Sequence, residues 1–319
     1  MGLLLTHYLL TYPDKAKSAR IAPVHGFLIH ALYFFSIMAS STPRQPIKSV
    51  VLRKTHKPTA KMGERFCSLM QGNNTSSGIS WQKQHLSFYV QVFANEGDLV
   101  VLPCEHQNIK YLNRTILSRL WGGQLAEKIY ANQWILSSAS ELSFYAANKH
   151  ELLHFDYMFV LEQDVAWKGD LSLILSAFDV QHEDFLCKDP EFVHDGHWAT
   201  EQESLGLHGN WWDEGVGGWL ETHSGWATIH IKQRCWVFFT RYSRFLLEEL
   251  ATNYLAQGRW AQCEWFASTV CTLYLPECRV FGYEDLGVFG PIFRLGGANI
   301  NETDWTSLPE NMLYHPIKF

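Results

Sequence analysis

The chain has 319 residues, of which 47% are hydrophobic and 18% are charged. This composition is typical of a globular protein with a sizeable core, and the length suits one large α/β domain with insertions. Lysine and arginine number 26 against 32 aspartate and glutamate, so the net charge is −6. A broad basic surface is therefore absent from the composition, which argues against nucleic acid as a partner.

The N-terminal segment, residues 1–78, carries the longest apolar run, Ile21–Ser41, directly after Lys15, Lys17 and Arg20. That order is typical of a signal-anchor, so one interpretation is a type II membrane protein of the Golgi or ER lumen with a membrane anchor at its N-terminus. The uninterrupted apolar stretch is shorter than the roughly 20 residues that span a bilayer. A buried helix or strand of a soluble protein is therefore the alternative.

The rest of this segment, residues 40–78, contains Pro43, Pro46, Pro58 and the polar run "QGNNTSSG". Proline and small polar residues at this density predict a linker and loop. A single domain should then follow over residues 79–319.

Two further patterns bear on the compartment. Triplets of the glycosylation type, as in glycoproteins, begin at Asn73, Asn74, Asn113 and Asn301. The seven cysteines allow up to three disulfides and one free thiol, and none of them form a Cys-x-x-Cys pair of the kind that indicates structural zinc. They stand at Cys67, Cys104, Cys187, Cys235, Cys263, Cys271 and Cys278.

From residue 79 onward the patterns of apolar residues predict regular elements in the following order. Strands are expected at 86–94 and 98–103, a helix at 114–140 with a break at Gly122-Gly123, a helix at 140–153 with Ser140 as N-cap, a strand at 157–161, a helix at 169–178 and a short strand at 184–189. Strands that alternate with helices indicate a Rossmann-like α/β domain with a mostly parallel sheet flanked by helices.

Two acids, Glu162 and Asp164, follow the strand at 157–161 directly. Ligands of open α/β sheets bind beyond the carboxyl ends of the strands, and alternate residues of a strand point to the same side. Two like charges at close range are costly unless a cation relieves them. Mn²⁺ or Mg²⁺ prefers carboxylate oxygens and keeps waters that phosphates can replace. The alternative is a pair of solvated turn acids.

The stretch "YMFVLEQDVAW", Tyr157–Trp167, resembles the strand and Asp-x-Asp-type signature of GT-A fold glycosyltransferases, with Glu162 in place of the first acid. The resemblance implies a GT-A-like domain that transfers sugar from a nucleotide-sugar donor to a glycan, glycoprotein or glycolipid acceptor. It also implies that Asp164 and Glu162 bind the donor through Mn²⁺ or Mg²⁺. Near the C-terminus, His315 matches the recurring third metal ligand of these enzymes, and Lys318 matches a lysine on the diphosphate.

A second segment, "CEWFAST" at Cys263–Thr269, resembles the Glu-aromatic-aromatic-x-x-Thr segment of many GT-A enzymes, including the branching N-acetylglucosaminyltransferases. The resemblance implies that Glu264 is the catalytic base of an inverting enzyme. A carboxylate among Trp260, Trp265 and Phe266 should have a raised pKa, which suits a general base. A helix-capping or salt-bridged glutamate is the alternative, and Asp285 in the run Glu284-Asp285 is a second candidate base.

The segment His197–Trp226 holds five tryptophans among glycines, which predicts a loop. Because sugar faces stack on tryptophan, the candidate acceptor-binding residues are Trp211, Trp212, Asp213 and Trp219. Packing of these rings on the core is the alternative. Two other functions remain open: a carbohydrate-binding relative without catalysis, and a glycoside hydrolase, which would need two carboxylates about 5 to 9 Å apart.

Overall fold

The computed structural model describes residues 47–55, 63–64, 67, 86–93, 102, 104, 106–131, 137–152, 154–194, 231–260, 263–283, 286–291, 293 and 302–317. The stretch from Ile47 to Phe319 forms one compact unit. The predicted anchor at residues 21–41 lies outside the described residues and stays a prediction. Within the described part of the chain, no helix combines the length and apolarity needed to cross a bilayer.

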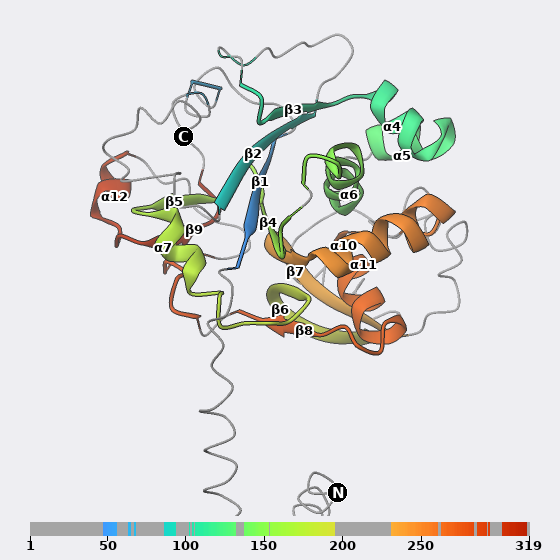
Figure 1. Cartoon of the computed structure of the whole chain (residues 1–319). Coiled ribbons are helices and arrows are strands. Elements are labelled where there is room, and N and C mark those ends of the chain that lie inside the picture. The colour runs from blue at the N-terminus through green and yellow to red at the C-terminus, as the bar shows by residue number, and fades with distance from the viewer. Residues whose placement is uncertain are drawn as a thin grey trace, which may run out of the picture. The chain divides into compact units, whose positions relative to one another are not determined.

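A seven-stranded sheet in the order β3-β2-β1-β4-β7-β6-β8 forms the centre of the molecule (Figure 1). Its strands are β1 Ser49–Thr55, β2 Leu86–Phe93, β3 Ile109–Leu112, β4 Tyr157–Leu161, β6 Phe185–His194, β7 Ile231–Ser243 and β8 Val280–Gly282. Neighbours pair in parallel except where β7 meets β4 and β6, so β7 alone among these seven strands runs against the others. The predicted α/β class with a mostly parallel sheet is confirmed.

Helices cover both faces of this sheet (Figure 1). One face carries α4 Arg114–Trp121, α5 Gly123–Ala131, α6 Ser137–Asn148, α10 Arg244–Glu249 and α11 Cys263–Thr269. The other carries α7 Leu171–Ser176, α12 Glu302–Ser307 and a small antiparallel sheet of β5 Ala166–Lys168 and β9 Met312–Tyr314. Coverage of both faces explains why the three successive apolar residues of β1, Val50, Val51 and Leu52, are all at most 3% exposed.

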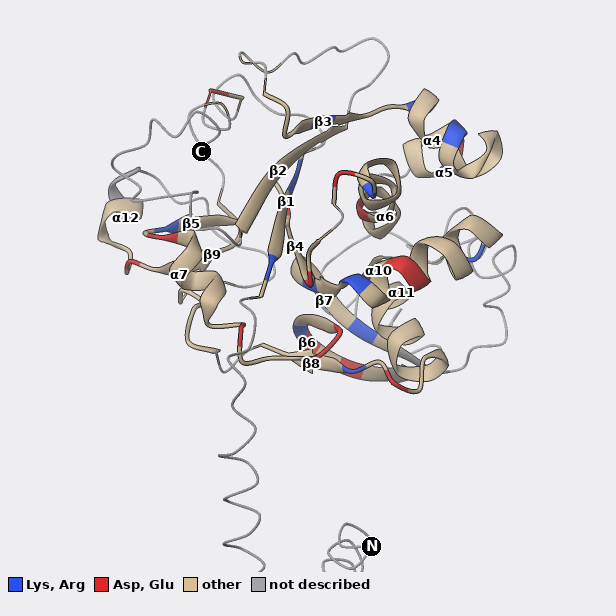
Figure 2. Ribbon diagram, in the orientation of Figure 1, with Lys and Arg blue, Asp and Glu red and all other residues tan. Residues whose placement is uncertain are grey.

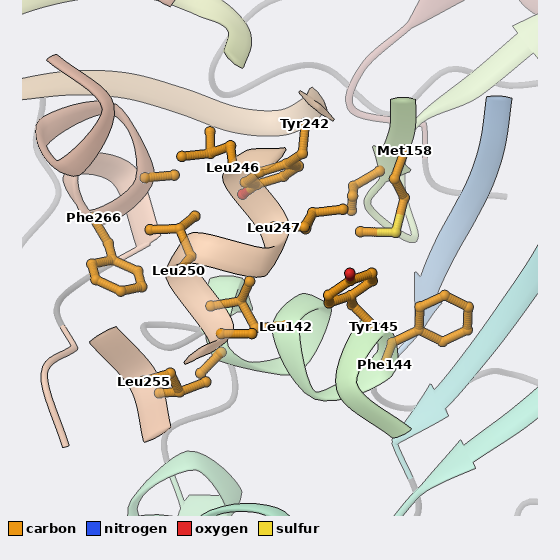
Figure 3. Close-up of a cluster of buried hydrophobic side chains, with 14 of the residues drawn as sticks. Leu142, Phe144, Tyr145, Met158, Tyr242, Leu246, Leu247, Leu250, Leu255 and Phe266 are labelled. Atoms are coloured by element: carbon orange, nitrogen blue, oxygen red, sulfur yellow. The ribbon is translucent and has the colours of Figure 1, made fainter. Parts of the chain in front are cut away.

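The two largest parts of the core therefore lie one on each face of the sheet. On the α6 side, Leu142 of α6, Met158 of β4, Leu247 of α10 and Phe266 of α11 pack together (Figure 3). On the α7 side, Phe159, Phe178 and Phe239 form an aromatic group with ring centroids 5.4 to 5.9 Å apart. Successive residues of β4 thus point into different cores, as the two-residue repeat of a strand requires.

Several boundaries differ from those expected. The prediction of linker and loop over residues 40–78 is wrong for Ser49–Thr55, because these residues form β1 in the middle of the sheet. Ser140 is not an N-cap, since α6 begins at Ser137 and the Ser140 hydroxyl donates to the Ser137 carbonyl oxygen at 2.7 Å. The strand expected at 98–103 lies outside the described residues except for Leu102, which is in no strand.

Other expectations are confirmed. The predicted break separates α4 from α5 at Gly122, whose φ of 81° favours glycine. The cysteines form three disulfides, Cys67–Cys104, Cys187–Cys235 and Cys271–Cys278. Cys263 is the remaining thiol and is buried.

Candidate functional site

The two acids after β4 lie in a tight turn rather than on the strand itself. The strand ends at Leu161, and the backbone N–H of Val165 donates to the carbonyl oxygen of Glu162 at 3.1 Å. The N–H of Glu162 donates to the carbonyl oxygen of Phe238 on β7 at 3.0 Å. The argument from strand alternation therefore does not apply to Glu162 and Asp164, although the turn still places them at the carboxyl end of β4.

His315 reaches this turn from the far end of the chain because β9 pairs with β5, with Tyr314 opposite Ala166. The backbone N–H of Ile317 donates to the carbonyl oxygen of Asp164 at 2.8 Å, which holds the chain after β9 against the turn. The imidazole of His315 is buried and stacks on the Phe238 ring, with centroids 4.1 Å apart. Its Nε2 lies 3.4 Å from Oδ1 of Asp164.

Glu162, Asp164 and His315 thus form one cluster, in which one ligand atom from each residue lies within 4.8 Å of the others. Burial raises the pKa of Glu162, the charge of Asp164 raises it further, and Lys54 and His315 oppose the shift. Two carboxylates and an imidazole are a donor set that suits Mn²⁺. A divalent cation would also remove the repulsion between the two acids, so the residues present fit such an ion.

A buried ion pair lies beneath the cluster. Lys54, near the end of β1, donates a hydrogen bond from Nζ to Oε1 of Glu141 on α6. The same Nζ lies 3.9 Å from Oε1 of Glu162. Burial alone would lower the pKa of Lys54, but the two carboxylates outweigh it and the pKa is raised, so this lysine stays charged at neutral pH.

Glu264 lies in the first turn of α11, which packs on β7. Burial raises its pKa to about 8, the charge of Arg234 opposes this shift, and the charge of Glu162 adds to it. The direction agrees with the expectation from its apolar surroundings. A carboxyl group with this pKa can take up a proton near neutral pH.

The remaining candidates from the sequence lie outside the described residues. They are the second base Asp285, the diphosphate lysine Lys318 and the acceptor-binding set Trp211, Trp212, Asp213 and Trp219. These residues stay predictions. Of the predicted site residues that the structure describes, Glu162, Asp164 and His315 form one cluster. Glu264 is close enough to Glu162 for the charge of Glu162 to raise its pKa.

Sequence reasoning missed three charged residues: Lys54 and Glu141, which lie next to Glu162, and Arg234, whose charge acts on Glu264. A signal for Lys54 existed, because it follows Val50 and Leu52 at alternate positions of a strand and therefore faces the core. This pattern was hidden by the prolines on either side, which favoured a linker. Glu141 had no such signal, since a glutamate in a helix is ordinarily exposed.

No protein-family model and no curated protein matches this chain. Among solved structures, the apo form of mouse xyloside xylosyltransferase 1 is similar, with 12% sequence identity and a TM-score of 0.30 over 66% of this chain and 71% of that chain. A likeness at this level assigns neither activity nor substrate.

Proposed function

We propose that the protein is a divalent-metal-dependent glycosyltransferase, which moves a sugar from a nucleotide-diphosphate sugar to a hydroxyl acceptor. The observation that carries the proposal is the convergence of Glu162, Asp164 and His315 on one point at the carboxyl end of β4. In sequence, Glu162 lies near the middle of the compact unit and His315 near its C-terminal end. The resemblance of Tyr157–Trp167 to the GT-A signature supports the same interpretation.

In this proposal Asp164, Glu162 and His315 hold Mn²⁺ or Mg²⁺. When bound, the ion supplies positive charge that stabilises the nucleoside diphosphate as the leaving group. The charges around the cluster support a bound cation. Lys54 is the nearby positive charge, and it is already paired with Glu141, so the negative charges of Glu162 and Asp164 are not balanced by it. Lys318 is proposed to contact the diphosphate.

Glu264 is the proposed general base. Its carboxylate would accept the proton of the acceptor hydroxyl as that oxygen attacks the anomeric carbon of the donor sugar. Direct attack with an enzyme base inverts the anomeric configuration, so we propose an inverting enzyme. The acceptor is a glycan, glycoprotein or glycolipid, and Trp211, Trp212, Asp213 and Trp219 are proposed to bind it by stacking and hydrogen bonds.

We also propose that the enzyme works in the Golgi or ER lumen, with residues 21–41 as its membrane anchor. Three disulfides among the described residues support this compartment, because disulfides persist in oxidising environments and are rare in the cytosol. Expression in a secretory cell line tests it: glycosidase-sensitive protein in the Golgi or ER supports the proposal, and an unglycosylated cytosolic protein contradicts it.

Titration calorimetry with UDP, in the presence and in the absence of Mn²⁺, tests the enzyme class. The transferase should bind UDP in a Mn²⁺-dependent manner, since the ion links the cluster to the diphosphate. A carbohydrate-binding relative without catalysis should bind glycans but show no metal-dependent nucleotide binding. A subsequent screen of nucleotide sugars, scored by release of the nucleoside diphosphate, identifies the donor.

A further inference from the structure

The pair of Lys54 and Glu141 is an unusual feature for the interior of a sheet protein. Lys54 points into the α6-side core, since it shares a face of β1 with Val50 and Leu52. The side chains of Lys54 and Glu141 are 3% and 1% exposed. A buried ion pair of this kind is weak evidence for stability, because well-packed apolar residues in its place are often equally stable or more so.

The position of the pair indicates a different role. The ammonium group of Lys54 has a second carboxylate at 3.9 Å, that of Glu162, whose side chain is 26% exposed. Lys54 therefore stands between an acid in the core and an acid at the surface of the metal cluster. Figure 2 marks the basic and acidic residues along the ribbon, and basic residues lie on β1 and β7 of the central sheet.

The helix that carries Glu141 is tied to the sheet. Gln91 of β2 is buried and donates from Nε2 to the carbonyl oxygen of Ser140 at 3.0 Å, which fixes the first turns of α6 to the sheet. A chain of contacts thus runs from β2 through α6 and β1 to the turn after β4. Each member is buried until Glu162 is reached.

We infer that Lys54, fixed by Glu141, is a positioning residue that orients the carboxylate of Glu162 toward a cation shared with Asp164 and His315. This inference rests on the proposed metal centre. Lys54 acts through Glu162 rather than on the substrate. A partner that orients a metal ligand in this way typically contributes about 10- to 100-fold to metal affinity.

A double variant separates positioning from stability. Lys54→Met with Glu141→Leu removes one positive and one negative charge, so the net charge of the site is unchanged. We expect this variant to fold with a melting temperature near that of the wild type. Its dissociation constant for Mn²⁺ alone, measured by calorimetry on the full chain, should rise by about 10- to 100-fold.

The matched control is Lys110→Met with Glu151→Gln. This change removes a second ion pair with no net charge, in which Nζ of Lys110 on β3 lies 2.6 Å from Oε2 of Glu151 in the turn after α6. Its Mn²⁺ affinity should equal that of the wild type. A Lys54/Glu141 double variant that also binds Mn²⁺ like the wild type would overturn the inference.

Glu141→Gln provides an independent measurement should the double variant fail to fold. It keeps the shape of the side chain, while Glu162 becomes the nearest carboxylate to Lys54. The lysine then competes with the cation for Glu162, so Mn²⁺ should bind more weakly. A purely structural role predicts a lower melting temperature with unchanged Mn²⁺ affinity, and that result would overturn the inference.

The same titration keeps this inference apart from the proposed function. Wild-type protein that binds Mn²⁺ but releases no nucleoside diphosphate from any nucleotide sugar contradicts the transferase alone. Wild-type protein that binds no Mn²⁺ contradicts the metal centre and the positioning role together.

Discussion

Within the cluster, Asp164 contacts the imidazole directly, since its Oδ1 lies 3.4 Å from Nε2 of His315. Asp164→Asn removes the charge of this acid and keeps its size. We expect Mn²⁺-dependent UDP binding to be lost while the melting temperature stays unchanged or rises, because clustered acids at a site oppose stability. Calorimetry and thermal unfolding measure the two effects.

Asp156→Asn is the matched control, because Asp156 precedes β4 at its opposite end and accepts a hydrogen bond from the backbone N–H of Lys48. This variant should bind UDP and Mn²⁺ like the wild type. Full Mn²⁺-dependent turnover in the Asp164 variant would remove this residue from the mechanism.

The proposed role of Glu264 as the general base leads to a prediction about turnover. Glu264→Gln keeps the shape of the side chain but cannot accept the proton of the acceptor, so turnover should fall by about 10²- to 10⁴-fold with donor affinity near that of the wild type. An active Glu264→Gln enzyme beside an inactive Asp285→Asn enzyme would assign the base to Asp285. The anomeric configuration of the product, determined by NMR, should be inverted, and retention together with an active Glu264→Gln enzyme rules out the assignment.

The raised pKa of Glu264 also leads to a prediction about how the stability of the fold depends on pH. Its folded-state pKa of about 8 lies above its ordinary value of 4.5, mainly because of burial. Between these values the folded protein holds a proton that the unfolded chain has lost, so this group lowers the free energy of unfolding by at most about 1.4 kcal/mol per pH unit as pH rises. The effect is absent below the lower value and complete above the upper one.

Denaturant unfolding at several pH values measures this slope. In metal-free Glu264→Gln the decline of stability between pH 5 and 8 should be shallower than in the wild type. Identical slopes in the two proteins would mean that the carboxyl of Glu264 titrates normally.

At the scale of elements, the position of His315 depends on β9, and Gly290 shows how closely this strand is packed. A Cβ atom at Gly290 would lie 2.1 Å from the ring of Tyr314, the neighbour of His315. Gly290→Ala should therefore displace the end of β9 and weaken Mn²⁺ binding, with a loss of stability of about 1–3 kcal/mol for overpacking. Gly123→Ala is the control, because no atom lies within 4 Å of the new Cβ. Equal Mn²⁺ affinity in the two variants would show that His315 does not need β9 in its present position.

The sequence predicted the elements whose patterns are local. The apolar run of β4, the helical spacing of α4 and α5 and the break at Gly122 depend on near neighbours, and all three are confirmed. It failed for β1, because seven residues between prolines carry too little pattern to distinguish a buried strand from a linker. Parallel strands bury both faces, so β1 shows no alternation of apolar and polar residues.

The candidate site was predictable to a different degree. Glu162, Asp164 and His315 could be named from motif resemblance, but their approach depends on the pairing of β5 with β9 across about half of the chain. No local pattern encodes such a pairing. The ion pair of Lys54 and Glu141 could not be predicted once β1 was interpreted as a linker, since its partners lie 87 residues apart.

At the scale of the whole molecule, the sheet and the C-terminal strand together create one place where opposite ends of the compact unit meet. Because β1 and β4 are neighbours and run parallel, their carboxyl ends lie at the same edge of the sheet. The pairing of β9 with β5 brings His315 to this edge. The net charge of the protein is −6, and acids outnumber bases at this edge of the sheet. Both features favour the binding of a cation there over the binding of an anion. The central claim is therefore that a divalent ion binds at this point.

The most direct test is a crystal structure of the full chain grown with Mn²⁺ and UDP, with diffraction data collected at the manganese absorption edge. We predict an anomalous difference peak between the side chains of Asp164 and His315, with Glu162 beside it and the diphosphate of UDP in contact with the ion. UDP bound elsewhere, or an empty map at Glu162, Asp164 and His315 under saturating Mn²⁺, would contradict the account.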